Sequence, residues 1–341
     1  MTNPFKIKVE HVSKVFGPDP KTALARVEAG LSKAQLLAQS RNVLGLHDIN
    51  LSIRAGETFV IMGLSGSGKS TLIRHFNRLI EPTAGRILVD DVDVLSLSEA
   101  ELRAFRRKKV SMVFQRFALL PHKTVLENVI YGLMIDGMPK AQAREKGAAQ
   151  IALVGLQGFE GHYPGQLSGG MQQRVGLARA LATDAEILLM DEAFSALDPL
   201  IRHDMQLQLR DLQARLHKTI VFITHDLDEA LLLGDDIAIL KDGVVRQVGT
   251  GTDILVSPAD DYVARFVRDV NRARVVTCGS LVVPGSGGGD VSLSADQTIE
   301  SAFALLAATD APIPVRRSNG EIMGVLTRQR VFEAMALAQP R

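Results

Sequence analysis

The feature that most constrains the fold of this chain is a glycine-rich segment at residues 63–70, Gly-Leu-Ser-Gly-Ser-Gly-Lys-Ser. It follows an apolar, strand-like run at 59–62 and precedes a helical stretch. Its glycines let successive backbone N–H groups point at one anion, Lys69 adds a positive charge, and the Ser70 hydroxyl can ligate magnesium. A lone Gly/Ser turn is common at strand ends, but the complete pattern in this setting predicts nucleoside triphosphate binding. The residues expected to hold the phosphates are Gly63, Ser65, Gly66, Ser67, Gly68, Lys69, Ser70 and Thr71.

The composition indicates an ordinary globular protein. With 341 residues, 46% of them hydrophobic, the chain is long enough for one large domain and a small one. No apolar run approaches the roughly 20 residues of a membrane-spanning helix, and the first residues lack the apolar core of a signal peptide. The single cysteine, Cys278, excludes an intramolecular disulfide and a cysteine-rich zinc site. We therefore expect a protein that stays in the cytoplasm.

The charge balance argues against nucleic acid as a partner. The formal net charge is +1, so the chain lacks the basic excess that dominates nucleic-acid affinity. Its densest basic run, 106–109, precedes an apolar segment, and we interpret it as a solvated helix end, where cations are favourable.

The spacing of apolar residues predicts an α/β fold. Residues 5–16 and 46–62 are typical of strands, whereas 22–39 has helical spacing and is interpreted as an inserted helix. The stretch 98–181 is mainly helical, and from residue 187 short apolar runs alternate with helical segments. Such alternation indicates a largely parallel sheet covered by helices.

A glycine-rich segment near the C-terminus predicts a linker. Residues 284–289, Pro-Gly-Ser-Gly-Gly-Gly, cannot bury enough surface to order themselves. After them we expect a helix at 296–308, strands at 313–316 and 322–326, and a helix from 329, which together form a small β-α-β-β-α unit.

Two carboxylates follow an apolar run directly. Ile187–Met190 predicts a buried strand that delivers Asp191 and Glu192 to its carboxyl edge, where α/β sheets bind ligands. Asp191 suits a magnesium ion and its water shell, and Glu192 suits polarising the water that attacks the γ-phosphate. A strand that merely reaches solvent is the alternative for such a run taken alone.

A second segment has the chemistry of an anion site. Ser168, Gly169 and Gly170 open a helix with apolar residues at 171, 175, 178 and 181, and the N–H groups at a helix start attract anions. The alternative is an ordinary serine-capped helix.

Together with the earlier motifs, Leu167–Gly170 makes the chain resemble the ATP-binding-cassette (ABC) ATPases over residues 5–268. The resemblance implies an α/β fold with a RecA-like core and mainly parallel sheet, an antiparallel N-terminal β subdomain and an inserted helical subdomain at about 98–181. It places the ATPase domain at 1–270, a linker at 271–290 and a small C-terminal module at 291–341.

The resemblance also implies roles for residues whose types alone are not diagnostic. Gln115 would touch magnesium and the attacking water, His225 would contact the γ-phosphate, and Asp198 would lie in a dimer-contact loop. Phe16 would stack on adenine in place of the commoner tyrosine, although core packing is its alternative. The expected catalytic residues are therefore Glu192, His225 and Gln115, and the expected magnesium site is Ser70, Gln115 and Asp191.

The same resemblance implies partners. Two copies would form a head-to-tail dimer that holds two ATP molecules, each between Gly63–Thr71 of one chain and Ser168–Gly170 of the other. Closure of the dimer on ATP would drive movement of transmembrane permease subunits. The dimer would therefore lie at the cytoplasmic face of the inner membrane as a peripheral protein.

Within the family, the early insertion, the stretches 62–85 and 191–202 and the tail resemble the ATPase subunits of glycine betaine/proline importers, whose relatives carry choline. A periplasmic or extracellular substrate-binding protein would be an indirect partner. An importer for another small solute, or a non-transport nucleotide sensor, is the alternative.

The tail resembles one repeat of a cystathionine β-synthase (CBS) module, which in these importers usually comes in pairs. Residues 324–330 match the closing strand and helix of the repeat. Arg330 stands where nucleotide-binding repeats carry an aspartate, so a pairing or docking unit is the alternative to adenosine binding.

Overall fold

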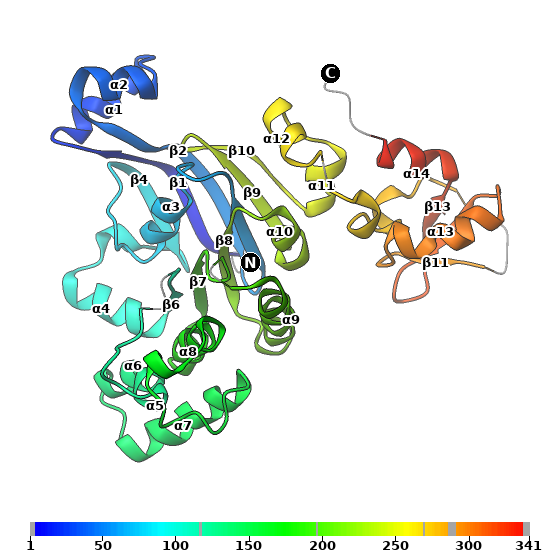
Figure 1. Cartoon of the computed structure of the whole chain (residues 1–341). Helices are drawn as coiled ribbons and strands as arrows, with labels where there is room; N and C mark the ends of the chain where they lie inside the picture. Colours follow the sequence, from blue (N-terminus) through cyan, green and yellow to red (C-terminus); the bar gives the residue numbers. More distant parts are fainter. Residues whose placement is uncertain (1–3, 116–117, 196, 269, 286–290, 337–341) are drawn as a thin grey trace. The chain divides into compact units, whose positions relative to one another are not determined.

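A computed structural model describes residues 4–115, 118–195, 197–268, 270–285 and 291–336. The chain forms two compact units (Figure 1). The first comprises residues 1–235 and 240–245, and the second comprises 236–239 and 246–341. None of the described helices has the length and apolar character needed to cross a membrane.

The N-terminal strands form an antiparallel sheet, as predicted. β1 (Phe5–Phe16) lies between β2 (Val43–Arg54) and β4 (Ala84–Val89), and β5 (Val92–Asp93) pairs with β4. Along β2 buried and exposed residues alternate, which is the pattern of a strand with one face on a core. The antiparallel β subdomain is therefore confirmed.

A parallel sheet forms the centre of the first unit and sets the position of the site. Its strands lie in the order β3 (Thr58–Met62), β8 (Thr219–Thr224), β7 (Ile187–Asp191) and β6 (Val110–Val113). Every residue of β3, β7 and β8 is buried, as expected for a parallel sheet covered on both faces. In the register, Met62 pairs with Thr224 and Asp191 with Ile223, so these strands end together.

Helices follow or interrupt these strands. The described part of 98–181 is mainly helical, as predicted, and β6 coincides with the apolar, strand-like run at 110–114. The helices of the first unit that come after the glycine-rich loop are α3 (Lys69–Phe76), α4 (Glu99–Lys108), α5 (Val125–Val129), α6 (Tyr131–Ile135), α7 (Lys140–Leu153), α8 (Gly169–Ala182), α9 (Pro199–Leu216) and α10 (Leu227–Leu233).

The insertion between β1 and β2 differs from the single helix that we predicted at 22–39. It consists of two helices, α1 (Pro20–Glu28) and α2 (Lys33–Ser40). The break has a local cause, since Gly30 adopts φ 99° and Ser32 caps a new helix by accepting a hydrogen bond from the Gln35 backbone N–H.

The second unit contains the predicted β-α-β-β-α order. Its elements are β11 (Leu293–Ser294), α13 (Ile299–Ala308), β12 (Ile313–Arg316), β13 (Ile322–Leu326) and α14 (Arg328–Met335), with the sheet order β11-β12-β13. α11 (Gly251–Val256) and α12 (Asp261–Phe266), which we placed in the ATPase domain, also belong to this unit, and β9 (Asp236–Lys241) and β10 (Val244–Gly249) have residues in both.

The range predicted as a linker, 271–290, is structured in its described part. It contains the short helices η3 (Arg272–Arg274) and η4 (Cys278–Leu281), and Val283 exchanges two backbone hydrogen bonds with Val325, at 2.9 and 3.0 Å. Residues 271–285 are thus part of the compact C-terminal unit, because strand pairing satisfies their backbone groups. The glycine-rich residues 286–289 lie outside the described residues.

One buried residue of α3 makes stability depend on pH. His75 is fully buried, and its Nδ1 lies 2.6 Å from the Thr71 carbonyl oxygen. Burial lowers the pKa of His75 from 6.5 to about 4, so the fold holds the imidazole neutral.

We predict that this histidine contributes stability above pH 6.5, its unfolded pKa, and that the contribution is lost as the pH falls through about 4. The loss amounts to about 3 kcal/mol of unfolding free energy for a shift of this size. Chemical denaturation between pH 7.5 and 4 should show that the unfolding free energy falls less steeply with decreasing pH for His75→Gln than for the wild type. The exposed His203→Gln is the control, and equal slopes for all three proteins would contradict the assignment.

Candidate nucleotide site

The glycine-rich loop connects β3 to α3, and its glycines are required by their surroundings. Gly63 has φ 150°, and a Cβ there would lie 2.3 Å from the Leu240 carbonyl oxygen. Gly68 has φ 106° at the start of α3, where a Cβ would lie 2.8 Å from the Gly45 carbonyl oxygen. Any other residue at these positions would strain the backbone and collide with neighbouring strands, so these glycines are needed for the curled path of the loop.

Lys69 is already seated inside the loop. Its Nζ donates to the carbonyl oxygens of Gly63, at 2.8 Å, and Leu64, at 3.2 Å, and lies 3.5 Å from Glu192 Oε1. The residue is only 4% exposed. Burial lowers its pKa, while the nearby Glu192 carboxylate opposes the change and favours the ammonium. The Lys69 ammonium is therefore held within the loop. A phosphate group bound there would take the place of the two carbonyl oxygens as its hydrogen-bond acceptor.

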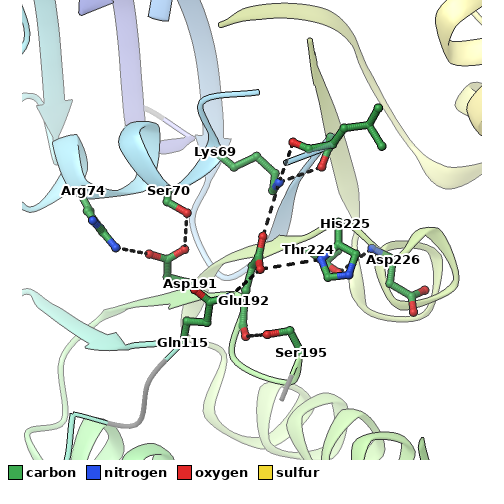
Figure 2. A network of polar contacts seen from close by, with 12 residues as sticks. Lys69, Ser70, Arg74, Gln115, Asp191, Glu192, Ser195, Thr224, His225 and Asp226 are labelled. Atoms are coloured by element: carbon green, nitrogen blue, oxygen red, sulfur yellow. Dashed lines mark hydrogen bonds and ion pairs between the residues drawn. The ribbon is translucent and has the colours of Figure 1, made fainter. Parts of the chain in front are cut away.

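Asp191 joins the loop helix to the sheet (Figure 2). Its Oδ1 accepts a hydrogen bond from the Ser70 hydroxyl at 2.8 Å, and its Oδ2 accepts one from Arg74 Nη2 at 3.1 Å. Asp191 is 2% exposed, so these partners compensate a buried charge. Ser70 and Asp191, two of the predicted magnesium ligands, are therefore adjacent. Sequence reasoning missed Arg74, although its position four residues after Ser70 puts it on the same helix face.

Glu192 lies where the predicted catalytic residues meet (Figure 2). Gln115 Nε2 donates to its Oε2 at 2.9 Å, and His225 Nδ1 lies 3.8 Å from the same oxygen. The Glu192 backbone has φ 46°, uncommon for a non-glycine residue, and Ser195 Oγ donates to its carbonyl oxygen at 2.9 Å. This sharp turn directs the carboxylate back over the sheet edge toward Lys69.

His225 owes its place to the end of β8. Thr224 Oγ1 accepts a hydrogen bond from the Asp226 backbone N–H at 2.9 Å, which turns the chain directly after the strand. His225 follows Thr224, and Thr224 pairs with Met62 just before the loop. The register of the parallel strands thus brings His225 to the sheet edge beside Glu192, and its contact with a γ-phosphate stays a prediction.

A cavity of about 390 Å³ covers this edge. Of the predicted residues it is lined by Phe16, the loop from Ser65 to Thr71, Gln115 and Glu192. Phe16 is 39% exposed at the end of β1, so it is not a core residue, and its stacking on adenine stays a prediction. Residues 43–45 of β2 and Lys33 of α2 also line the cavity, and sequence reasoning missed them because they come from distant elements.

Five predicted nucleotide-binding residues do not line this cavity: Gly63, Ser168, Gly169, Gly170 and Asp198. The predicted catalytic residue His225 and magnesium ligand Asp191 are not among its lining residues either. Ser168 caps α8, its Oγ accepting from the Met171 N–H at 3.3 Å, and Gly169 follows it as the first residue of the helix. Asp198 caps α9 by accepting from the Ile201 N–H at 3.1 Å. A Cβ on Gly170 would lie 2.7 Å from Ile201 Cγ2, so close packing requires this glycine. Within one chain, Ser168 and Asp198 thus act as helix caps. A role of these residues and the two glycines of α8 in the nucleotide site of a second copy stays a prediction.

A parallel sheet whose carboxyl edge carries this loop, a buried Asp–Glu pair, a glutamine and a histidine defines a phosphate-loop ATPase. A family model described as ABC transporter matches residues 46–195. The chain belongs to the ATP-binding proteins of the ABC transporter family, which are ATPases.

Three similar proteins illustrate the relationship. The glycine betaine transport ATP-binding protein OpuAA of Bacillus subtilis is 55% identical over 279 residues, 82% of this chain and 67% of the relative. The trimethylamine N-oxide transport system ATP-binding protein TmoW of Ruegeria pomeroyi is 45% identical over 332 residues, 97% of both chains. The solved dimer of the ATP-binding cassette MJ0796, in a post-hydrolysis state with ADP and Pi, has a TM-score of 0.62 and 34% identity, covering 72% of this chain and 98% of that one.

Proposed function

We propose that this chain is the ATP-hydrolysing subunit of a membrane importer for glycine betaine, proline or a related quaternary amine such as choline. The observation that carries the proposal is the 55% identity to a glycine betaine transport ATP-binding protein across 82% of the chain. A specific observation also favours a second cargo, trimethylamine N-oxide, because the relative named for it matches almost the whole chain, tail included. Glycine betaine, choline and trimethylamine N-oxide are all small solutes whose nitrogen carries three methyl groups.

The residues at the sheet edge fit a magnesium–ATP complex. Ser70, Asp191 and Gln115 offer the hydroxyl, carboxylate and amide oxygens that magnesium prefers, and when bound the ion neutralises charge on the β- and γ-phosphates. Lys69 donates to phosphate oxygens in place of its present carbonyl partners. Glu192 accepts a hydrogen bond from the attacking water and takes its proton, while Gln115 holds the carboxylate in place.

The dimer and the permease complete the proposed cycle. Ser168, Gly169, Gly170 and Asp198 of one copy would close over the γ-phosphate held by the other, as a bound nucleotide favours only the closed pair. The likeness to a solved cassette dimer supports this arrangement. Among the described residues of the helical region, six large apolar side chains are exposed. Such exposure marks interaction surfaces and suits docking of the transmembrane permease subunits at the cytoplasmic face of the inner membrane. The six side chains are those of Tyr131, Met134, Ile135, Leu153, Phe159 and Tyr163.

The C-terminal module would act by pairing. Phe303 of α13 and Phe332 of α14 are 45% and 70% exposed, and they line an apolar cavity of about 400 Å³. A single CBS-like repeat leaves such a face uncovered, and the module of a second copy supplies the same face. We therefore assign the tail to contact between protomers that regulates the ATPase.

We predict that Glu192→Gln binds ATP with wild-type affinity but does not hydrolyse it, because the amide cannot take the proton from water. ATP should then raise the dimer fraction of the variant in light scattering, while ADP should leave it at the level of the nucleotide-free protein. A variant that stays monomeric with ATP bound would contradict the shared site.

We predict that cells lacking this chain lose uptake of labelled glycine betaine under salt stress. Choline, proline and trimethylamine N-oxide are measured in parallel. Loss of trimethylamine N-oxide uptake alone would establish the second cargo, and unchanged uptake of all four would remove both. Complementation with Glu192→Gln should not restore uptake. This result would show that transport needs ATP hydrolysis and not only the presence of the subunit in the transporter.

We predict that Phe332→Glu weakens association of the tails, because a charge in an apolar contact must be desolvated. Cross-linking of the full chain without nucleotide should yield fewer dimers. Ile322→Glu, an exposed apolar position of β13 in the same module, is the matched control. Equal yields for the wild type and both variants would contradict the pairing.

A further inference from the structure

The inserted helical pair has no part in the catalytic arrangement, yet it supplies one wall of the nucleotide cavity. Lys33, the first residue of α2, lines this cavity together with Phe16 and the segment 43–45 of β2. Phe16 and Val43 are paired in the antiparallel sheet, so this wall lies at the end of the β1–β2 ladder. The glycine-rich loop lines the same cavity.

Two local devices hold Lys33 at that place. The capping box of Ser32 and Gln35 sets the start of α2, with hydrogen bonds in both directions between side chain and backbone. Leu36, three residues after Lys33 and on the same helix face, is fully buried in a cluster with Val15 and Leu44. The helix is thus anchored to β1 and β2, and its first turn is fixed against the cavity.

The Lys33 ammonium lacks a protein partner. Within the described part of the chain it makes no hydrogen bond or ion pair, and its side chain is partly buried. The other lysine of the cavity, Lys69, is engaged with two carbonyl oxygens and a carboxylate. A partly desolvated, unpaired cation facing a polyphosphate site gains most from an anionic ligand, because Coulomb attraction strengthens where water is excluded.

We propose that Lys33 is a nucleotide-contacting residue and that the inserted helices form the nucleoside-side wall of the ATP site. Lys69 and the loop grip the β- and γ-phosphates, and Lys33 approaches from the β1–β2 side, so its ammonium contacts the α-phosphate and ribose. The inference rests on nucleotide binding by this cavity and is independent of the transported cargo.

The test is equilibrium binding of magnesium–ADP and of magnesium–AMP-PNP to the full chain by titration calorimetry. Lys33→Gln should weaken both nucleotides by the same factor, about two- to fivefold, as expected for a partly exposed ion pair. Lys33→Glu should weaken them about tenfold or more, because repulsion replaces attraction. Lys33→Arg keeps the positive charge and should bind both nucleotides with wild-type affinity. If only the aliphatic stem of Lys33 mattered, Lys33→Arg and Lys33→Gln would have the same affinity.

Ionic strength gives a second readout. Since salt screens a charge contact, the dissociation constant of the wild type should rise more steeply with salt than that of Lys33→Gln. Lys21→Gln, an exposed lysine of the same insertion outside the cavity, is the matched control, and Lys69→Ala should abolish binding.

Wild-type affinity and salt dependence in both Lys33→Gln and Lys33→Glu would overturn the proposal, as would an effect on AMP-PNP alone, which would place the contact at the γ-phosphate. Failure of the wild type to bind either nucleotide would instead overturn the proposed ATPase function. Melting temperatures equal to that of the wild type would show that the variants are folded.

Discussion

The site depends on the parallel register of three buried strands. β3, β8 and β7 end side by side, so the residues that follow them meet at one edge although they are far apart in the chain. The loop with Lys69 follows β3, His225 follows β8, and Glu192 follows β7. A slip of one residue in either pairing would move a catalytic side chain by a full strand rise of about 3.3 Å and turn it to the other face. Complete burial of these strands makes such a slip expensive.

Around this edge the charges are arranged before any ligand binds. Lys69 lies between two carbonyl oxygens and Glu192, and Asp191 lies between Ser70 and Arg74. Each buried charge therefore has a partner of its own, as buried ions require. In the proposed function, nucleotide and metal would replace these partners rather than enter an uncompensated pocket.

Much of this arrangement could be predicted from sequence because its determinants are local. The glycine-rich loop, the acidic pair and the strands 313–316 and 322–326 are set by neighbouring residues, and the last two were predicted at their observed bounds. The rest depends on contacts between distant elements. Arg74 reaches Asp191 across 117 residues, and Lys33 lines the same cavity as the loop although it comes from a different element. Within residues 271–285, backbone hydrogen bonds tie Val276, Cys278 and Gly279 to residues 295–299, and Val283 to Val325 of β13. No periodicity reports such contacts. The split of the insertion into two helices was missed for another reason, because Ser32–Gln35 was not recognised as a helix start.

The position of His75 links the acid response of the protein to its ligand. His75 is held neutral by burial one helical turn beyond Thr71, and the Thr71 carbonyl oxygen accepts its ring hydrogen bond, while Thr71 itself lines the cavity. A bound nucleotide stabilises the native form of this turn, and protonation of the imidazole disfavours it. The two equilibria would thus be coupled through this turn, so a ligand in the cavity would lower the pH at which the protein unfolds.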